Sequence, residues 1–178
     1  NYAAPQTALR KMGLQKSHRA SIAQNANTSC PSPKFSEPYT KMPTEVLTKL
    51  EIAERQLNRA ISLLIEDSDR VCAITLAGAA EEVLAGLLKA IGKIDVLSEI
   101  SQASVDMGKI VGQTWTLGTF KSDFNFVKNE LKHHDRGNEK IPIFEEASTE
   151  IISRAIENFR RLSGNYSHQM HTFMSKYS

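Results

Sequence analysis

Apolar residues recur every three or four positions from Val46 to Leu64, and this spacing constrains the fold more than any other feature. Such a period places them on one face of an α-helix, where they can be buried together. The side chain of Thr44 can cap the first turn, so we expect a helix from there to about residue 66. A second stripe, over about residues 69–92, follows a break at Asp67-Ser68-Asp69. A connection this short predicts two antiparallel helices.

The rest of the chain continues in helical periods, with no pattern typical of paired strands. Residues 95–111 predict one or two short helices, and residues 144–163 predict a long one. Between them, a helix to about His134 has a core stripe made of Phe120, Phe124, Val127 and Leu131. The predicted fold class is all-α: a four- to five-helix up-and-down bundle, with a short helical insert between the second and third main helices.

Composition divides the chain into three parts. Residues 1–41 carry six basic residues and one acid, lack a sustained apolar period, and are expected to be disordered or non-native. They could be a transit peptide, a basic tail for an acidic partner, or residues upstream of a true start at Met42, which is the interpretation we favour. Residues 42–164 are the predicted bundle domain, and residues 165–178 a polar tail expected to fray.

Charge and apolar content exclude several classes of protein. Residues 42–178 hold 16 basic and 19 acidic residues, so no general basic surface for nucleic acid is expected and any RNA contact would be local. The apolar stretch from Val71 to Ile91 contains Glu81, Glu82 and Lys89, which predicts a buried helix and no membrane span. Cys30 and Cys72 offer neither a disulfide framework nor metal-ligand spacing. We therefore expect a cytoplasmic protein with no cofactor and no metal.

One segment, Lys128 to His134, has the residue types of a binding or catalytic site. Asn129 and His133 are four apart and share a helix face. Lysine, asparagine and histidine at one helix end can bind a phosphate, and histidine can act as a general acid or base near neutral pH. The alternative is structural, because cations such as Lys132 and His134 are favoured at a helix C-terminus by the helix dipole alone.

The stretch Lys128-Asn129-Glu130-Leu131-Lys132-His133 resembles the signature of HEPN domains (higher eukaryotes and prokaryotes nucleotide-binding). That family carries an arginine, often followed by asparagine, and then a histidine, on the third main helix of a similar bundle. The Ala- and Glu-rich segment from Leu76 to Leu84 is similar to the helix that precedes it in such proteins. The resemblance covers about residues 44–163.

The resemblance implies a symmetric homodimer in which two copies of the motif face each other across a cleft. In active members the arginine and histidine cleave RNA without a metal and leave a cyclic phosphate. Carried over, His133 would be the acid/base, Lys128 would stand where the family has arginine, and Asn129 would stabilise the site. Glu81 or Glu82 would orient His133, and the substrate-binding set would comprise Lys132, His134, Glu81 and Glu82. Lysine cannot make the bidentate phosphate contact of arginine.

Two functions therefore remain open. The first is a HEPN-like helical dimer that binds RNA or a nucleotide, as a metal-independent endoribonuclease of a toxin or defence system, with an antitoxin or other protein as a further partner. It requires the side chains of Lys128 and His133 to be accessible to solvent. The alternative is a non-catalytic helical protein-interaction module with a structural polar cluster.

Three other features have weaker predictions. Thr75, Gly78, Glu82 and Gly86 share a face of mostly small side chains, which favours close packing. Trp115 could stack on a base, although an anchor covering the bundle is the commoner role. His168 and His171 are three apart and form at best half of a metal site.

Overall fold

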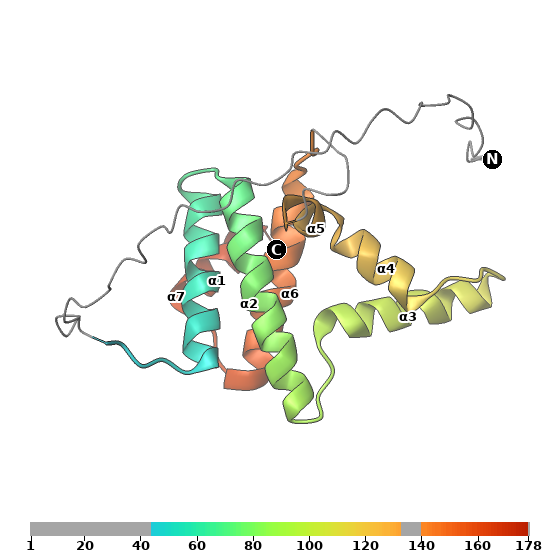
Figure 1. Cartoon of the computed structure of the whole chain (residues 1–178), viewed down its shortest axis with the longest axis horizontal. Helices are drawn as coiled ribbons and strands as arrows, with labels where there is room; N and C mark the ends of the chain where they lie inside the picture. The colour runs from blue at the N-terminus through green and yellow to red at the C-terminus, as the bar shows by residue number, and fades with distance from the viewer. Residues whose placement is uncertain (1–43, 133–139, 178) are drawn as a thin grey trace, which may run out of the picture. The chain divides into compact units, whose positions relative to one another are not determined.

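Within residues 44–132 and 140–177, the ranges that the structure, a computed structural model, describes, the regular secondary structure is all helical, with loops between the helices (Figure 1). The helices are α1 (Lys49–Ile65), α2 (Arg70–Ala90), α3 (Val96–Ile110), α4 (Leu117–Phe124), α5 (Phe126–Lys132), α6 (Glu145–Ser163) and α7 (His168–Tyr177). All of them belong to one compact unit, Thr44–Ser178. The predicted all-α bundle is confirmed, whereas the interpretations of residues 1–41 lie outside the described residues.

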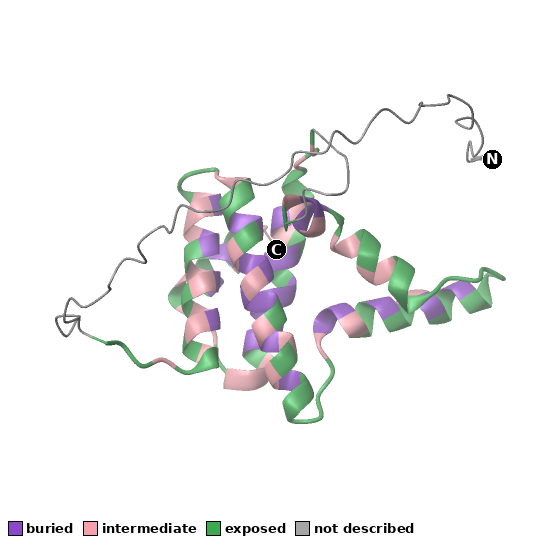
Figure 2. Ribbon diagram, in the orientation of Figure 1, coloured by how far each residue is buried: buried purple, intermediate pink, exposed green. Residues whose placement is uncertain are grey.

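The core lies where α1, α2 and α6 pack together. Their inward faces carry the periodic apolar residues, and the buried positions in Figure 2 follow these faces. Among the described residues, six large aliphatic side chains are less than 2% exposed: Leu57, Ile61, Ile74, Leu84, Leu88 and Ile152. Because burying one such side chain contributes about 1.5–3 kcal/mol, this face-to-face packing is the main source of stability.

The first helix begins later than Thr44. Thr48 is its N-cap: its hydroxyl accepts a hydrogen bond from the amide of Glu51 at 3.2 Å. The carboxylate of Glu51 in turn accepts from the amide of Thr48 at 2.7 Å. This reciprocal pair is a capping box, which requires Glu or Gln three residues after the cap. Leu47 holds that position after Thr44, so the predicted cap at Thr44 is wrong.

The polar tail does not fray. Residues 168–177 form α7, which packs against α1 and buries Met170 and Phe173 in the core. The hydroxyl of Ser167 bonds the amide of Met170 at 3.3 Å and the side chain of Asn58 at 2.6 Å, which fixes the start of the helix. The apolar spacing of Met170 and Phe173 is the signal that the composition of the tail conceals.

The insert is one 15-residue helix, α3, and the predicted third main helix is two helices, α4 and α5, divided at Asn125. Together α3 and α4 form a hairpin that extends from the bundle, and we call residues 96–124 the arm (Figure 1). Its base is anchored to α6, where Asn158 accepts a hydrogen bond from the amide of Val96 at 3.0 Å. Arg161 adds an ion pair to Glu99 at 2.6 Å.

Among the described residues, α2 is the one helix long and apolar enough to cross a membrane by length and composition alone. Core helices of soluble proteins meet the same criterion. In this structure α2 packs against both α1 and α6 and buries eight of its residues.

Candidate functional site

Four of the residues singled out in the sequence lie around one cleft. Lys128 and Asn129 from α5 and Glu81 and Glu82 from α2 line a space of about 290 Å³, which we call the polar cleft. Its remaining lining residues come from α2, from the arm and the residue before it, and from the helix break: Ala85, Asp95, Leu97, Ser98, Lys121 and Asn125. Lys132 lies next to them and binds Glu82 at 2.8 Å. His133 and His134, the predicted acid/base and its neighbour, lie outside the described residues.

Behind the cleft, three charged side chains form a buried ionic cluster of Glu81, Lys128 and Arg154. Arg154 donates to Oε1 of Glu81 from Nε at 2.5 Å and to Oε2 from Nη2 at 3.4 Å. The ammonium group of Lys128 lies 3.4 Å from Oε2 of the same carboxylate. Removing a charge from water is costly, so such groups are stable in the interior only when paired. Glu81 is thus the anion that holds two cations inside the bundle.

The side chain of Lys128 is only 6% exposed, so the predicted solvent accessibility of this lysine is wrong. Gly78 is the reason that it fits. A Cβ atom at Gly78 would lie 2.6 Å from Cδ of Lys128, closer than two carbon atoms can approach. The small-residue face of α2 therefore provides a channel for a lysine side chain, in addition to the predicted close packing.

Glu82 connects the buried cluster to solvent. Its carboxylate is 3.3 Å from the Lys128 ammonium and 2.8 Å from that of Lys132, and its side chain is 56% exposed. Burial raises the pKa of the Glu82 carboxyl, but the hydrogen bond from Lys132 and the charge of Lys128 outweigh it and leave the pKa below its usual value. Glu82 therefore stays ionised and neutralises the outer side of the cluster.

Asn129 is half-buried, and its side chain makes no hydrogen bond within the described residues. Of the two family-motif residues described, it is the one whose polar group is free for a ligand in the polar cleft. The ammonium group of Lys128, in contrast, already lies beside two carboxylates, and its side chain is almost completely buried.

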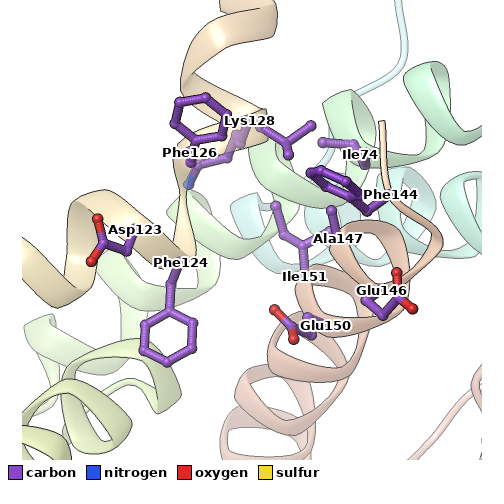
Figure 3. A pocket seen from close by; sticks show the side chains of 11 residues that line it. Ile74, Asp123, Phe124, Phe126, Lys128, Phe144, Glu146, Ala147, Glu150 and Ile151 are labelled. Carbon is purple, nitrogen blue, oxygen red and sulfur yellow. The ribbon is translucent and has the colours of Figure 1, made fainter. Parts of the chain in front are cut away.

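A second hollow lies on the other side of Lys128. The aromatic pocket, about 280 Å³, is lined by Phe124, Phe126 and Phe144, with Ile74 at its base (Figure 3). Three carboxylates also line it, those of Asp123, Glu146 and Glu150, and none forms an ion pair within the described residues. Unpaired carboxylates repel a phosphate, so this face is unsuited to an RNA backbone.

The division between α4 and α5 belongs to the same network. The side-chain oxygen of Asn125 accepts a hydrogen bond from Nη2 of Arg154 at 3.3 Å. Asn125 has φ −102° and ψ 9°, outside the helical range, and its own amide closes α4 onto Lys121. Arg154, which the sequence reading did not single out, therefore fixes both the buried carboxylate and the helix break. The sequence feature that could have indicated a buried role for Arg154 is its place as a lone arginine between the apolar positions Ile151 and Ala155.

The other sequence features do not join this site. No group of three or more His, Cys, Asp or Glu that could hold a metal occurs in the part of the chain that the structure describes. His168 and His171 are both exposed on α7. Trp115 covers α3 within the arm, where a Cβ atom at Gly108 would lie 2.6 Å from its ring, so it anchors the arm and not the bundle.

Comparison with protein-family models, with curated proteins and with solved structures finds no match for this chain.

Proposed function

We propose that the helical unit is a non-catalytic protein-interaction module in which Glu81, Lys128 and Arg154 form a structural cluster. The observation that carries the proposal is the position of the Lys128 ammonium group, buried between the carboxylates of Glu81 and Glu82. A phosphate could bind Lys128 only by displacing these carboxylates. Breaking a buried ion pair costs about 3–5 kcal/mol, more than a contact with one lysine returns.

The electrostatics of the surroundings support the same proposal. Lys121, the other cation of the polar cleft, donates to Ser98 at 2.9 Å. Partial burial raises the pKa of neighbouring Asp95, but hydrogen bonds from Ser98 and the charge of Lys121 lower it below its usual value. Each lysine that lines the polar cleft thus already has an anionic neighbour. A partner recognised by shape and apolar contact suits this surface better than a polyanion.

A second candidate function is the HEPN-like dimer that binds RNA or a nucleotide, with ribonuclease activity through His133. The observation that favours it is the convergence of Lys128, Asn129, Glu81 and Glu82 on one cleft, with the Asn129 side-chain amide making no hydrogen bond to the described residues. In this candidate Lys128 orients the site from within and Asn129 contacts the ligand.

RNA cleavage by the full purified chain tests the two candidates against each other. Wild type, His133→Ala and Asn129→Ala would be incubated with single-stranded and structured RNA in the presence of a chelator. The non-catalytic proposal expects no cleavage by any of them. Cleavage by wild type that His133→Ala abolishes would overturn it and support the second candidate. Lys128→Met separates the two possible roles of the lysine. If the lysine is structural, the substitution changes the unfolding midpoint and leaves RNA binding unaltered.

A further inference from the structure

The helix α3 is apolar on two opposite faces, although the bundle and α4 cover only one. The covered face includes Leu97, Ser101, Val105 and Gly108, all buried. The other face carries Ile100, Ala103, Met107 and Ile110 at spacings of three, four and three residues, all exposed. Met107 is 57% exposed and Ile110 is 79% exposed. Alternating spacings of three and four are the heptad pattern that pairs one helix with another.

A groove beside this stripe is also apolar. It has a volume of about 380 Å³ and lies between α3 and the aromatic residues of the arm. Its lining contains no charged side chain: Ile100, Ala103, Ser104, Met107, Trp115 and Phe120. Trp115 and Phe120 meet edge to face with ring centroids 5.3 Å apart, so the groove has a fixed aromatic wall. A fixed apolar wall accepts an aliphatic side chain without first having to be ordered.

The charges of the arm are largely neutralised within the protein. Lys109 pairs with Asp106 at 2.8 Å, and Glu99 pairs with Arg161. A surface with little unpaired charge does not select a strongly acidic or basic partner. It is, however, compatible with an identical surface, because two copies brought face to face do not repel each other.

The exposed apolar area of the arm approaches the size that each partner contributes to a stable dimer. Six large apolar side chains of the arm are at least 37% exposed: Ile100, Met107, Ile110, Val111, Trp115 and Leu117. Together they present on the order of 600 Å² of accessible surface, close to the roughly 800 Å² that each partner contributes to a standard stable interface.

We propose that the arm is a self-association surface, on which the α3 stripe of one copy packs against the α3 stripe of a second copy around a two-fold axis. In a two-fold interface the same patch serves on both sides, so a self-complementary heptad stripe beside an apolar groove meets the requirement. This inference rests on the proposed interaction function and names its partner. It differs from the dimer implied by the family resemblance, in which copies of the motif at Lys128 face each other.

Sedimentation of the full chain across the micromolar range tests the proposal, with Met107→Glu and Ile110→Glu as variants. Both side chains are exposed in the single chain, so the variants should unfold like wild type. Wild type is expected to dimerise, and each glutamate, placed in an apolar interface, should weaken association by about 100-fold or more. Val46→Glu is the matched control, since Val46 is 89% exposed outside the arm, and it should dimerise like wild type.

The single tryptophan gives an independent readout, because Trp115 lines the groove and is 42% exposed. Its emission should move to shorter wavelength as wild type associates, and should stay constant for Ile110→Glu. A wild type that remains monomeric across the range overturns the self-association proposal. So does a dimer that both glutamate variants leave intact. Neither result bears on catalysis, whereas RNA cleavage that depends on His133 would overturn the non-catalytic function alone.

Discussion

Oε2 of Glu81 accepts a hydrogen bond from the ammonium group of Lys128 at 3.4 Å, and neither side chain is more than 6% exposed. The adjacent carboxylate, Glu82, contacts the same ammonium group but is 56% exposed. Two consecutive glutamates on one helix therefore hold opposite positions, one inside the bundle and one at its surface.

Glu81→Gln and Glu82→Gln should differ sharply in stability. The first removes the anion that neutralises two buried cations, and should lower the free energy of unfolding by about 3–5 kcal/mol. The second removes a partly exposed pair, and should cost less than about 1 kcal/mol. Urea denaturation at neutral pH measures both. Equal costs for the two variants would contradict a structural role for the buried ionic cluster.

Gly78→Ala and Gly86→Ala form a matched pair on α2. A methyl group at position 78 meets Cδ of Lys128 at 2.6 Å, so the lysine must move away from its carboxylates. We expect a loss of about 1–3 kcal/mol, as is usual for overpacking in an interior. Nothing lies within 4 Å of a Cβ atom at Gly86, where alanine should stabilise the helix by up to about 1 kcal/mol. A stabilising Gly78→Ala would show that Lys128 is not packed against this glycine.

Arg154→Lys tests whether one arginine fixes both Glu81 and the break at Asn125. A lysine is a point charge and cannot bind both oxygens of Glu81 while also reaching Asn125. The expected loss is about 1–3 kcal/mol, together with faster amide hydrogen exchange across α4 and α5. Arg55→Lys on α1 is the control, because Arg55 is exposed and, among the described residues, pairs with Glu45. Unchanged exchange in Arg154→Lys would separate the helix break from the cluster.

The bundle itself could be predicted from the sequence because its signal is local. The periodic apolar residues of α1, α2 and α6 define the buried faces, and Asp69 caps α2 through the amide of Cys72 at 3.0 Å, as its position before the second stripe indicates. The residues at which the first and last helices begin depend on individual side-chain hydrogen bonds. Thr48, and not Thr44, is the N-cap of α1, because Glu51 completes the capping box with Thr48.

The state of the candidate site could not be predicted, because it depends on pairing across helices. A lysine beside a motif asparagine is expected at the surface, and only the path across Gly78 to Glu81 places it inside. Arg154 lies 73 residues along the chain from Glu81, so no local sequence pattern indicates that the two side chains pair. Likewise, the apolar stripe from Phe120 to Leu131 predicts one helix, and the structure divides it at Asn125, which contacts Arg154.

Acid should loosen the base of the arm, and Glu157 is the residue through which it acts. Hydrogen bonds from Arg160 and Arg161, together with their charges, prevail over partial burial and lower the pKa of the Glu157 carboxyl from 4.5 to about 2. Glu157 also holds Arg161 at 3.0 Å, and Arg161 reaches the arm through Glu99 and the carbonyl of Ile94. Because the pKa is lower in the folded chain, the stabilisation is complete above pH 4.5 and is lost as the pH falls toward about 2.

Glu157→Gln removes this pH dependence and so isolates it. At neutral pH the variant should unfold at a lower temperature than wild type, and the difference between the two should shrink steadily as the pH falls from about 4.5 to 2. Protection of the amides of residues 96–110 against exchange, measured relative to the intrinsic rate at each pH, should fall in wild type over the same interval and already be lowered in the variant at neutral pH. A difference in unfolding temperature that stays constant down to pH 2 would mean that Glu157 acts through packing and not through its charge.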